Sequence, residues 1–216
     1  LNCNCCKDDA DKVPGTNFWF CKKKKGFIPS IVENLIMRRA RIKEILKEKK
    51  DILLEARSES LKVLANSFYG YLGFYAARWY CLECAESVTA YGRYYINLVI
   101  QEAMKQGFRV IYSDTDSIFL ALENKTEKEA KDFVERINSK LPGIMELEYE
   151  NFYPFGIFVS AKEGQYGAKK KYALLDKDGN LKIVGFETVR RNWSFIAKEV
   201  QENVLDIILR KRNPIE

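Results

Sequence analysis

The residues with the clearest potential for chemistry are Asp114 and Asp116, which a threonine separates within the segment YSDTDS. The flanking segments, Arg109–Tyr112 and Ser117–Leu122, are rich in β-branched and aromatic residues, which favour strands. The two carboxylates are therefore predicted at the tip of a β-hairpin. Like charges between apolar strands repel each other and lose solvation, and a bound divalent cation would offset that cost.

Residue types leave two interpretations of this acidic turn open and exclude a third. Asp, Ser and Thr are common turn residues, so a solvated loop fits the composition. An EF-hand calcium loop does not fit, because Phe119 and Lys125 stand where that loop needs glycine and glutamate. The chain has no histidine, and oxygen ligands favour Mg²⁺, or Mn²⁺, over Zn²⁺. Mg²⁺ usually accompanies substrate phosphates, so the hypothesis is a phosphate-handling metal site.

Composition narrows the function further. The lack of histidine excludes a Ser/His/Asp triad, a Cys/His zinc site and histidine general bases within this chain. A net charge of +6 favours a polyanionic partner. The positive residues gather in four groups: Lys22–Lys25, Arg38–Lys50, Lys169–Lys171 and Arg190–Arg191. We expect a soluble, cytoplasmic protein, because no apolar run is long enough for a membrane span and the start lacks a signal-peptide pattern.

The remaining pattern predicts an α+β fold. A helix opens at Pro29 and runs to Leu46, and a second covers 52–68; the short polar join makes them an antiparallel pair. A third helix covers 82–106 and stops at Gly107. A capping box at Thr126 and Glu129 opens a helix that ends near Asn138, before the break at Pro142 and Gly143. Strands are expected at 146–150, 156–160, 170–176 and 181–187, with a turn at Asp178–Gly179 and a last helix at 193–209.

A second group of residues lies on the predicted helix pair. Lys62, Asn66 and Gly70 recur at four-residue spacing and share one helical face, and Arg39 and Lys43 are four residues apart on the preceding helix. If the helices aim these cations into one groove, a triphosphate would fit between them. Exposed Lys and Arg that only improve solubility are the alternative that spacing leaves open.

Three motifs occur in the order KVLANSFYG, YSDTDS and KKKYA, and they resemble the fingers and palm of a family B DNA polymerase, most closely the archaeal branch. Further similar stretches, GFIPS, RWYCLECAESVTAYGR and GFETVRRNWS, extend the resemblance over almost the whole chain. It implies a DNA-directed DNA polymerase with an antiparallel palm sheet, packed helices and a projecting two-helix fingers hairpin, in an incomplete right-hand fold. The implied divisions are a Cys-containing palm segment at 1–28, fingers at 29–72, palm at 73–190 and the start of the thumb at 191–216.

The resemblance also implies roles for individual residues. Asp116, with Asp114 beside it, would ligate the catalytic Mg²⁺ ions, which lower the pKa of the primer 3′ hydroxyl and stabilise the leaving pyrophosphate. The nucleotide would be bound by Arg39, Lys43, Lys62, Asn66, Tyr69 and Gly70. DNA would be contacted by Thr115, Lys170, Lys171, Tyr172, Arg190, Arg191 and Trp193.

The same resemblance predicts partners besides primer–template DNA and dNTP. The family needs another catalytic carboxylate, on a strand resembling DFxSLYPS, and the 216 residues contain no such segment. We therefore expect a larger polypeptide that supplies this strand, the exonuclease and the remaining thumb, and a sliding clamp bound through the complex. A truncated chain and a naturally split enzyme both explain the gap, and we favour the split enzyme.

Two other classes of protein compete with this hypothesis. A non-catalytic, basic nucleic-acid-binding module explains the lysine clusters but gives no reason for the paired aspartates between apolar strands. A palm like that of reverse transcriptase also presents paired carboxylates, but these are usually adjacent, whereas Thr115 separates them here.

The six cysteines permit several states. The resemblance implies one disulfide between Cys6 and Cys21 and another between Cys81 and Cys84, as in thermophilic relatives, whereas a reducing cytosol would leave thiols. The additional Cys3 and Cys5 depart from the family pattern and would permit a four-thiolate zinc site with Cys6 and Cys21.

Overall fold

A computed structural model describes residues 3–5, 7–8, 10–160 and 167–211. The chain divides into two compact units, Leu1–Tyr95 and Ile96–Glu216, and the boundary falls inside one long helix. Among the described residues, no helix combines the length and apolar composition needed to cross a membrane.

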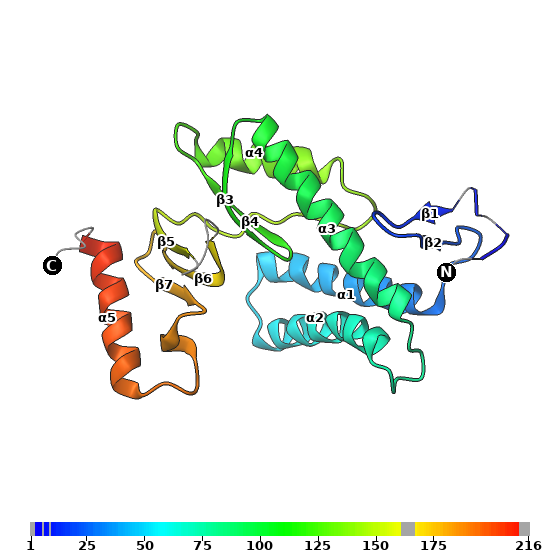
Figure 1. Cartoon of the computed structure of the whole chain (residues 1–216), viewed down its shortest axis with the longest axis horizontal. Helices are drawn as coiled ribbons and strands as arrows, with labels where there is room; N and C mark the ends of the chain where they lie inside the picture. The colour runs from blue at the N-terminus through cyan, green and yellow to red at the C-terminus, as the bar shows by residue number, and fades with distance from the viewer. Residues whose placement is uncertain (1–2, 6, 9, 161–166, 212–216) are drawn as a thin grey trace. The chain divides into compact units, whose positions relative to one another are not determined.

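The first unit contains a small hairpin and a helix pair. Strand β1 (Asp11–Lys12) pairs antiparallel with β2 (Trp19–Phe20), and helices α1 (Phe27–Glu48) and α2 (Ile52–Gly73) follow. The two helices lie side by side and antiparallel (Figure 1), which confirms the predicted pair. Asp51 caps α2 by accepting hydrogen bonds from the backbone N–H groups of Leu53 and Leu54, at 2.9 and 3.2 Å. The helix reaches Gly73 rather than Phe68, because no proline interrupts it.

Helix α3 (Leu82–Lys105) spans the boundary between the units and ends where the sequence predicted. Gly107 has φ +77, a left-handed conformation that glycine adopts without steric cost and that commonly ends helices. The next residue, Phe108, is buried in the second unit.

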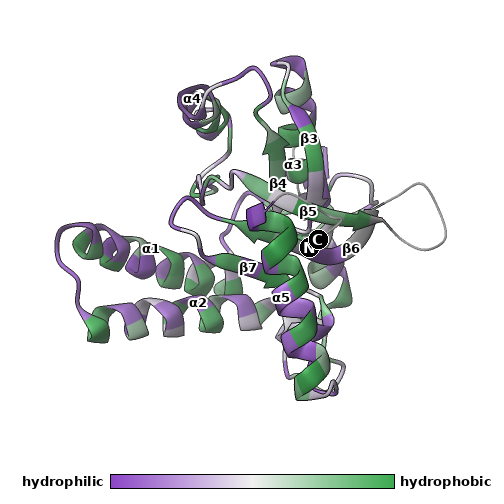
Figure 2. Cartoon of the chain, turned by 90° about the vertical axis from the view of Figure 1, so that its left-hand side faces the viewer, coloured by the Kyte–Doolittle hydropathy of each residue, from purple (hydrophilic) through white to green (hydrophobic). Residues whose placement is uncertain are grey.

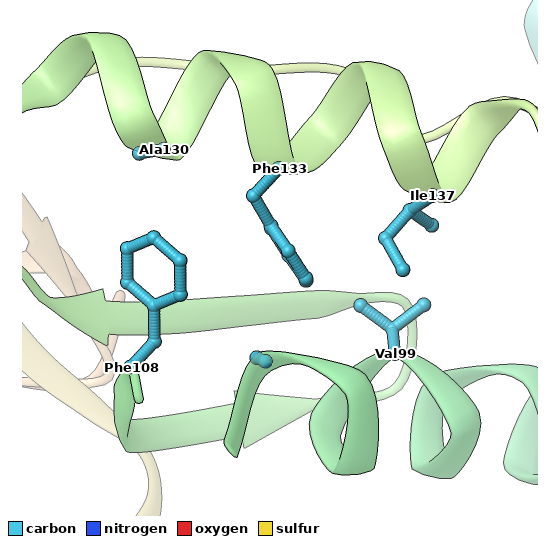
Figure 3. Close-up of a cluster of buried hydrophobic side chains, with 6 residues drawn as sticks. Val99, Phe108, Ala130, Phe133 and Ile137 are labelled. Atoms are coloured by element: carbon cyan, nitrogen blue, oxygen red, sulfur yellow. The ribbon is translucent and has the colours of Figure 1, made fainter. Parts of the chain in front are cut away.

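The second unit begins with a hairpin and a helix that share one core. Strands β3 (Arg109–Asp114) and β4 (Ser117–Ala121) pair antiparallel, and α4 (Glu127–Asn138) follows. The predicted capping box at the start of α4 is present, with both reciprocal hydrogen bonds formed. Side chains from α3, α4 and the segment between α3 and β3 form the core (Figure 3), which contains Val99, Ala103, Phe108, Ala130, Phe133 and Ile137.

A second sheet with its own core completes this unit. Its strand order is β5 (Phe155–Ser160), β6 (Gly167–Leu175) and β7 (Leu181–Val184), all antiparallel. The short helix η1 (Glu187–Val189) and α5 (Phe195–Lys211) follow. Apolar residues recur along α5 (Figure 2), and two of them pack against the sheet. The buried members of this core are Ala173, Leu175, Phe186, Leu205 and Leu209.

Some details differ from the sequence prediction. The strand predicted at 146–150 is absent, and that prediction was wrong. The side-chain amide of Asn138 donates to the Leu147 carbonyl at 2.9 Å and accepts from the Leu147 N–H at 2.8 Å, so a side chain satisfies this backbone in place of a neighbouring strand. Strand β7 ends at Val184, because Gly185 has φ +71, and α5 begins at Phe195 rather than Trp193. The strands β3 to β7 form two hydrogen-bonded sheets, β3–β4 and β5–β6–β7.

Candidate metal and nucleic-acid site

The predicted acidic hairpin is present, and its tip is a two-residue turn. Asp114 pairs with Ser117 as the last step of the β3–β4 ladder, and Thr115 and Asp116 form the turn. The Asp114 side chain is half-buried, whereas Asp116 is exposed. The turn therefore presents one carboxylate to solvent and keeps the other against the protein.

Hydrogen bonds and backbone strain define the shape of this turn. The Thr115 hydroxyl donates to Asp114 Oδ1 at 3.0 Å, and the Ser117 hydroxyl donates to the Asp114 carbonyl at 3.2 Å. Thr115 has φ +51, which is unfavourable for a β-branched residue. Such strain often marks functional positions, so the turn is a candidate site on grounds independent of its charge.

Four aromatic rings lie behind the turn and join the two sheets of the unit. They are Tyr112 of β3, Phe119 of β4, Phe158 of β5 and Tyr172 of β6. Every pair among the four has ring centroids 5.3 to 6.0 Å apart, within the range of favourable aromatic contacts. This aromatic cluster fixes the acidic hairpin against the strand that contains KKKYA.

Lys170 connects the same two elements through its backbone and its side chain. Its N–H donates to the Tyr112 hydroxyl at 2.5 Å, and its Nζ lies 3.9 Å from Asp114 Oδ2. The side chain is two-thirds exposed, and the residue has φ +57. Lys170 thus partly balances the charge of Asp114 and remains accessible to a polyanion.

Gly185 allows β6 to adopt this conformation. A Cβ atom at position 185 would lie 1.7 Å from the carbonyl oxygen of Lys170, far inside van der Waals contact. With its φ of +71, this position has two independent reasons to be glycine.

Lys171 and Tyr172 contact different residues from those that Lys170 contacts. Lys171 Nζ lies 2.9 Å from Glu187 Oε1 and 4.9 Å from the centre of the Phe186 ring. Gln201 of α5 donates to the same carboxylate at 2.6 Å. Lys171 is therefore engaged within the fold, and Tyr172 belongs to the aromatic cluster.

The Glu187 contacts predict a specific acid sensitivity. Hydrogen bonds from Gln201 and then Lys171 lower the pKa of Glu187 from 4.5 to about 2. Because the folded pKa lies below the ordinary value, this carboxylate stabilises the fold above about pH 4.5 and loses that effect as pH falls towards about 2. We expect Glu187→Gln to lower the melting temperature at neutral pH and to differ little from the unmodified chain near pH 2, in thermal melts across this range.

The matched control for this prediction is Glu135→Gln, which changes an exposed glutamate of α4. It should melt in parallel with the unmodified chain at every pH. A constant difference between Glu187→Gln and the unmodified chain down to pH 2 would contradict the assigned ion pair.

The other DNA-binding residues predicted in this unit are exposed. Arg190, Arg191 and Trp193 lie in the segment between η1 and α5, and 45% of the Trp193 surface is accessible. They are available to a ligand, but they are not part of the acidic turn.

In the first unit, the predicted nucleotide-binding cations lie on the helix pair. Arg39 and Lys43 are half-buried on α1, and Lys62 is exposed on α2, with its Nζ 3.2 Å from Glu59 Oε1. Arg39 Nε is buried and has no hydrogen-bond partner among the described residues. A buried donor without a partner is costly, so an oxygen-rich ligand would stabilise it.

Tyr69 and Gly70 line a hollow between α2 and α3, and Asn66 is exposed one turn earlier on α2. The sequence did not single out the other lining residues. These are Gly73, Leu82, Ala85, Glu86 and Thr89. Most of them lie within the segment RWYCLECAESVTAYGR, which resembles family B polymerases, but the resemblance assigned them no role.

The chemistry of the acidic turn suits Mg²⁺ or Mn²⁺ in part. Asp114 and Asp116 offer carboxylate oxygens, the hard ligands that these ions prefer. Among the described residues, the two aspartates do not form a cluster of three metal ligands with any other Cys, Asp or Glu. Further ligands must come from phosphates, water or residues outside the described part of the chain.

The cysteines of the CxxC segment are close together as thiols. Cys81 Sγ donates to Cys84 Sγ at 3.0 Å. Burial, followed by the hydrogen bond with Cys81, raises the pKa of Cys84 to about 12. The Cys81–Cys84 disulfide stays a prediction, and the Cys6–Cys21 disulfide involves Cys6, which lies outside the described residues.

The second unit thus contains a strained acidic hairpin beside a basic strand, and the first unit contains a basic helix pair. The sequence model that represents DNA polymerase family B matches residues 7–215 of this chain. DNA polymerase 1 of Pyrococcus abyssi is 49% identical over 221 residues, which cover 99% of this chain and 28% of that protein. A Thermococcus DNA polymerase is 48% identical, over 97% of this chain and 27% of that protein.

A solved structure agrees with these matches. The family B DNA polymerase of the archaeon Pyrobaculum calidifontis superposes with a TM-score of 0.66 at 36% identity, over 89% of this chain and 24% of that chain. This chain belongs to DNA polymerase family B. It spans about 28% of the length of the two Pyrococcus abyssi relatives.

Proposed function

We propose that this chain provides the fingers and part of the palm of a DNA-directed DNA polymerase, which adds deoxynucleotides to a primer 3′ hydroxyl on a DNA template. One observation supports this most strongly: the aromatic cluster holds the acidic turn against the KKKYA strand. The residues proposed to bind metal and the strand proposed to bind the duplex therefore lie side by side.

Asp116 and Asp114 would hold divalent cations, Mg²⁺ or Mn²⁺, with unequal roles. When bound, such ions supply Lewis-acid activation of the primer hydroxyl and charge stabilisation at the leaving pyrophosphate. Asp116 is the main ligand in this proposal, because its carboxylate is exposed. Asp114 contributes less, since Thr115 donates to it and Lys170 lies beside it.

The helix pair would bind the incoming nucleotide. Arg39, Lys43 and Lys62 would contact the triphosphate, which would also satisfy the buried Nε of Arg39. Asn66 would support this contact from α2. Tyr69 and Gly70 would lie beneath the nascent base pair, and the hollow that they line offers the space.

DNA would be bound without sequence preference through exposed basic and polar residues. Lys170 adjoins the acidic turn and Thr115 belongs to it, and these two would contact the new duplex together with the half-buried Tyr172. Arg190, Arg191 and Trp193 would contact the primer strand. Contacts to phosphate and sugar position a nucleic acid but do not read its bases. This suits an enzyme that copies any template.

The two neighbouring lysines of KKKYA should behave differently. Lys170 is exposed, so Lys170→Ala should weaken primer–template binding. The plot of log association constant against log salt concentration should become less steep, its slope decreasing in magnitude by about 0.9, the value for one phosphate contact. Lys171 is paired with Glu187, so Lys171→Ala should mainly lower the melting temperature and leave the slope unchanged. Fluorescence anisotropy across a salt series measures both.

Lys128→Ala, which removes an exposed lysine of helix α4, is the control for nonspecific loss of charge. If Lys171→Ala lowers the slope as much as Lys170→Ala, the assignment of Lys171 to the fold is incorrect. A flat salt profile for the unmodified protein would count against the proposed DNA-binding role altogether.

The proposed enzyme needs a partner polypeptide for its chemistry. The 216 residues lack a segment resembling DFxSLYPS, which would contribute the further carboxylate. We propose that a larger polypeptide supplies this strand, the exonuclease and the rest of the thumb, and that the complex recruits a sliding clamp. In the Pyrococcus relative, the matching region is about 28% of one chain.

Primer extension tests the proposal directly. We expect no extension by this chain alone, none by the larger polypeptide alone, and extension when the two are combined with Mg²⁺ and a DNA template. Extension at full rate by this chain alone would refute the shared metal site. Extension on RNA templates exceeding that on DNA would favour a reverse transcriptase instead.

A further inference from the structure

A group of three cysteines near the start of the chain lies apart from the residues assigned above. The Sγ atoms of Cys3, Cys5 and Cys21 all lie within 4.8 Å of one another. Cys5 Sγ is 3.4 Å from Cys3 Sγ and 3.9 Å from Cys21 Sγ. In the described part of the chain, this is the one group of three or more Cys, Asp or Glu residues close enough to share a metal ion.

The spacing of these sulfurs matches a thiolate metal site. Zinc binds thiolate at about 2.3 Å in a tetrahedral arrangement, which places neighbouring sulfurs about 3.8 Å apart. The separations of Cys5 Sγ from Cys3 Sγ and from Cys21 Sγ, 3.4 and 3.9 Å, bracket that value. A disulfide uses two sulfurs and leaves the third without a role, whereas a metal ion uses all three.

The local fold also needs a cross-link. Strands β1 and β2 contain two residues each, and such a short hairpin has little stability in water. Val13 is its one deeply buried apolar side chain among the described residues up to position 26. The Trp19 indole N–H donates to the Cys3 carbonyl at 3.1 Å and already joins the first residues to β2. Cys21 directly follows β2, so a metal at these sulfurs would fasten both ends of the hairpin.

We propose that Cys3, Cys5 and Cys21 bind one Zn²⁺ ion that holds this hairpin in place, and that the site is structural. Each thiol loses its proton when it binds, so three thiolates and Zn²⁺ have a net charge of −1. A ligand from outside these three residues completes the coordination, and no redox step is involved.

Metal content of the full 216-residue chain, purified without chelator, tests the proposal. We expect about one zinc ion per chain by mass spectrometry. The variants Cys3→Ser, Cys5→Ser and Cys21→Ser should each lower zinc affinity at least about 100-fold in competition with a chromogenic chelator. The matched controls, Cys81→Ser and Cys84→Ser, remove cysteines outside the group and should leave zinc content unchanged.

Cobalt substitution distinguishes a defined tetrahedral thiolate site from nonspecific metal binding. Co²⁺ in the unmodified chain should show thiolate charge-transfer bands and the intense visible bands of tetrahedral coordination, and these should weaken in each of the three variants. Circular dichroism shows whether a variant has lost its helices. If a variant has lost its helices, the unmodified chain is tested with a chelator instead. Removal of zinc should lower its melting temperature, and added Zn²⁺ should restore the original value.

Two results would overturn the proposal. One is purified protein without zinc in which peptide mapping finds Cys21 joined by a disulfide to Cys6. The other is zinc that the Cys81→Ser and Cys84→Ser controls remove as effectively as the three test variants do. Both outcomes leave the polymerase assignment intact, because that assignment rests on the acidic turn and the basic residues.

Discussion

Asp116→Ala, in an assembled polymerase that contains this chain, is expected to lower the rate of nucleotide addition by at least about 10³-fold. Asp116 is exposed at the tip of the strained turn, where its carboxylate can ligate a metal ion without disturbing the core. DNA affinity should change little, because the phosphate contacts come from lysines and arginines. Single-turnover primer extension gives the rate, and fluorescence anisotropy gives the affinity.

Two further variants separate chemistry from folding. Asp114→Ala should cause a smaller loss of rate, because Asp114 is half-buried and already engaged by Thr115 and Lys170. Asp178→Ala removes an exposed aspartate from the turn between β6 and β7 and should leave the rate unchanged. Loss of DNA binding together with activity in Asp116→Ala would point to a structural role for that residue.

Gly185→Ala is expected to have the largest effect on stability, a loss of at least about 4 kcal/mol in the free energy of unfolding. The new Cβ would lie 1.7 Å from the Lys170 carbonyl oxygen, and φ +71 is unfavourable for alanine. Relief of the overlap requires β6 and β7 to separate beside the acidic turn. Denaturant unfolding followed by circular dichroism measures the loss.

Gly143→Ala is the matched control for the backbone conformation. Gly143 also has a positive φ, +61, but a Cβ there would meet nothing within 4 Å. It should lose only about 1 kcal/mol, the cost of the conformation itself. Equal losses in the two variants would show that the contact with Lys170 is unimportant.

Local patterns in the sequence were sufficient for much of the fold. The capping box at Thr126 and the stop at Gly107 depend on residues within a few positions of each other, and both were predicted correctly. The turn at Asp114 and Asp116 was also located, because the residues on both sides are β-branched and aromatic types that favour strands. These features arise from short-range interactions that a sequence displays directly.

Features that depend on distant partners could not be predicted. The Asn138 amide replaces a strand for Leu147, and no local pattern indicates that pairing. Lys171 resembles its neighbour Lys170 in sequence, yet the carboxylate that binds it lies 16 positions away. The contact between Tyr112 and Tyr172 likewise forms only once two sheets pack together. The resemblance to family B polymerases implied DNA contacts for Lys170, Lys171 and Tyr172 but could not assign their contacts within the fold.

The aromatic cluster has a consequence for how the proposed polymerase would move along DNA. Because interiors pack densely, Tyr112 and Phe119 cannot shift relative to Phe158 and Tyr172 without losing their ring contacts. The acidic turn and the KKKYA strand therefore keep a constant separation during a catalytic cycle. After each addition, the double helix must advance by one base pair past two stationary elements, so the step length is set by the DNA and not by a stroke of this part of the protein.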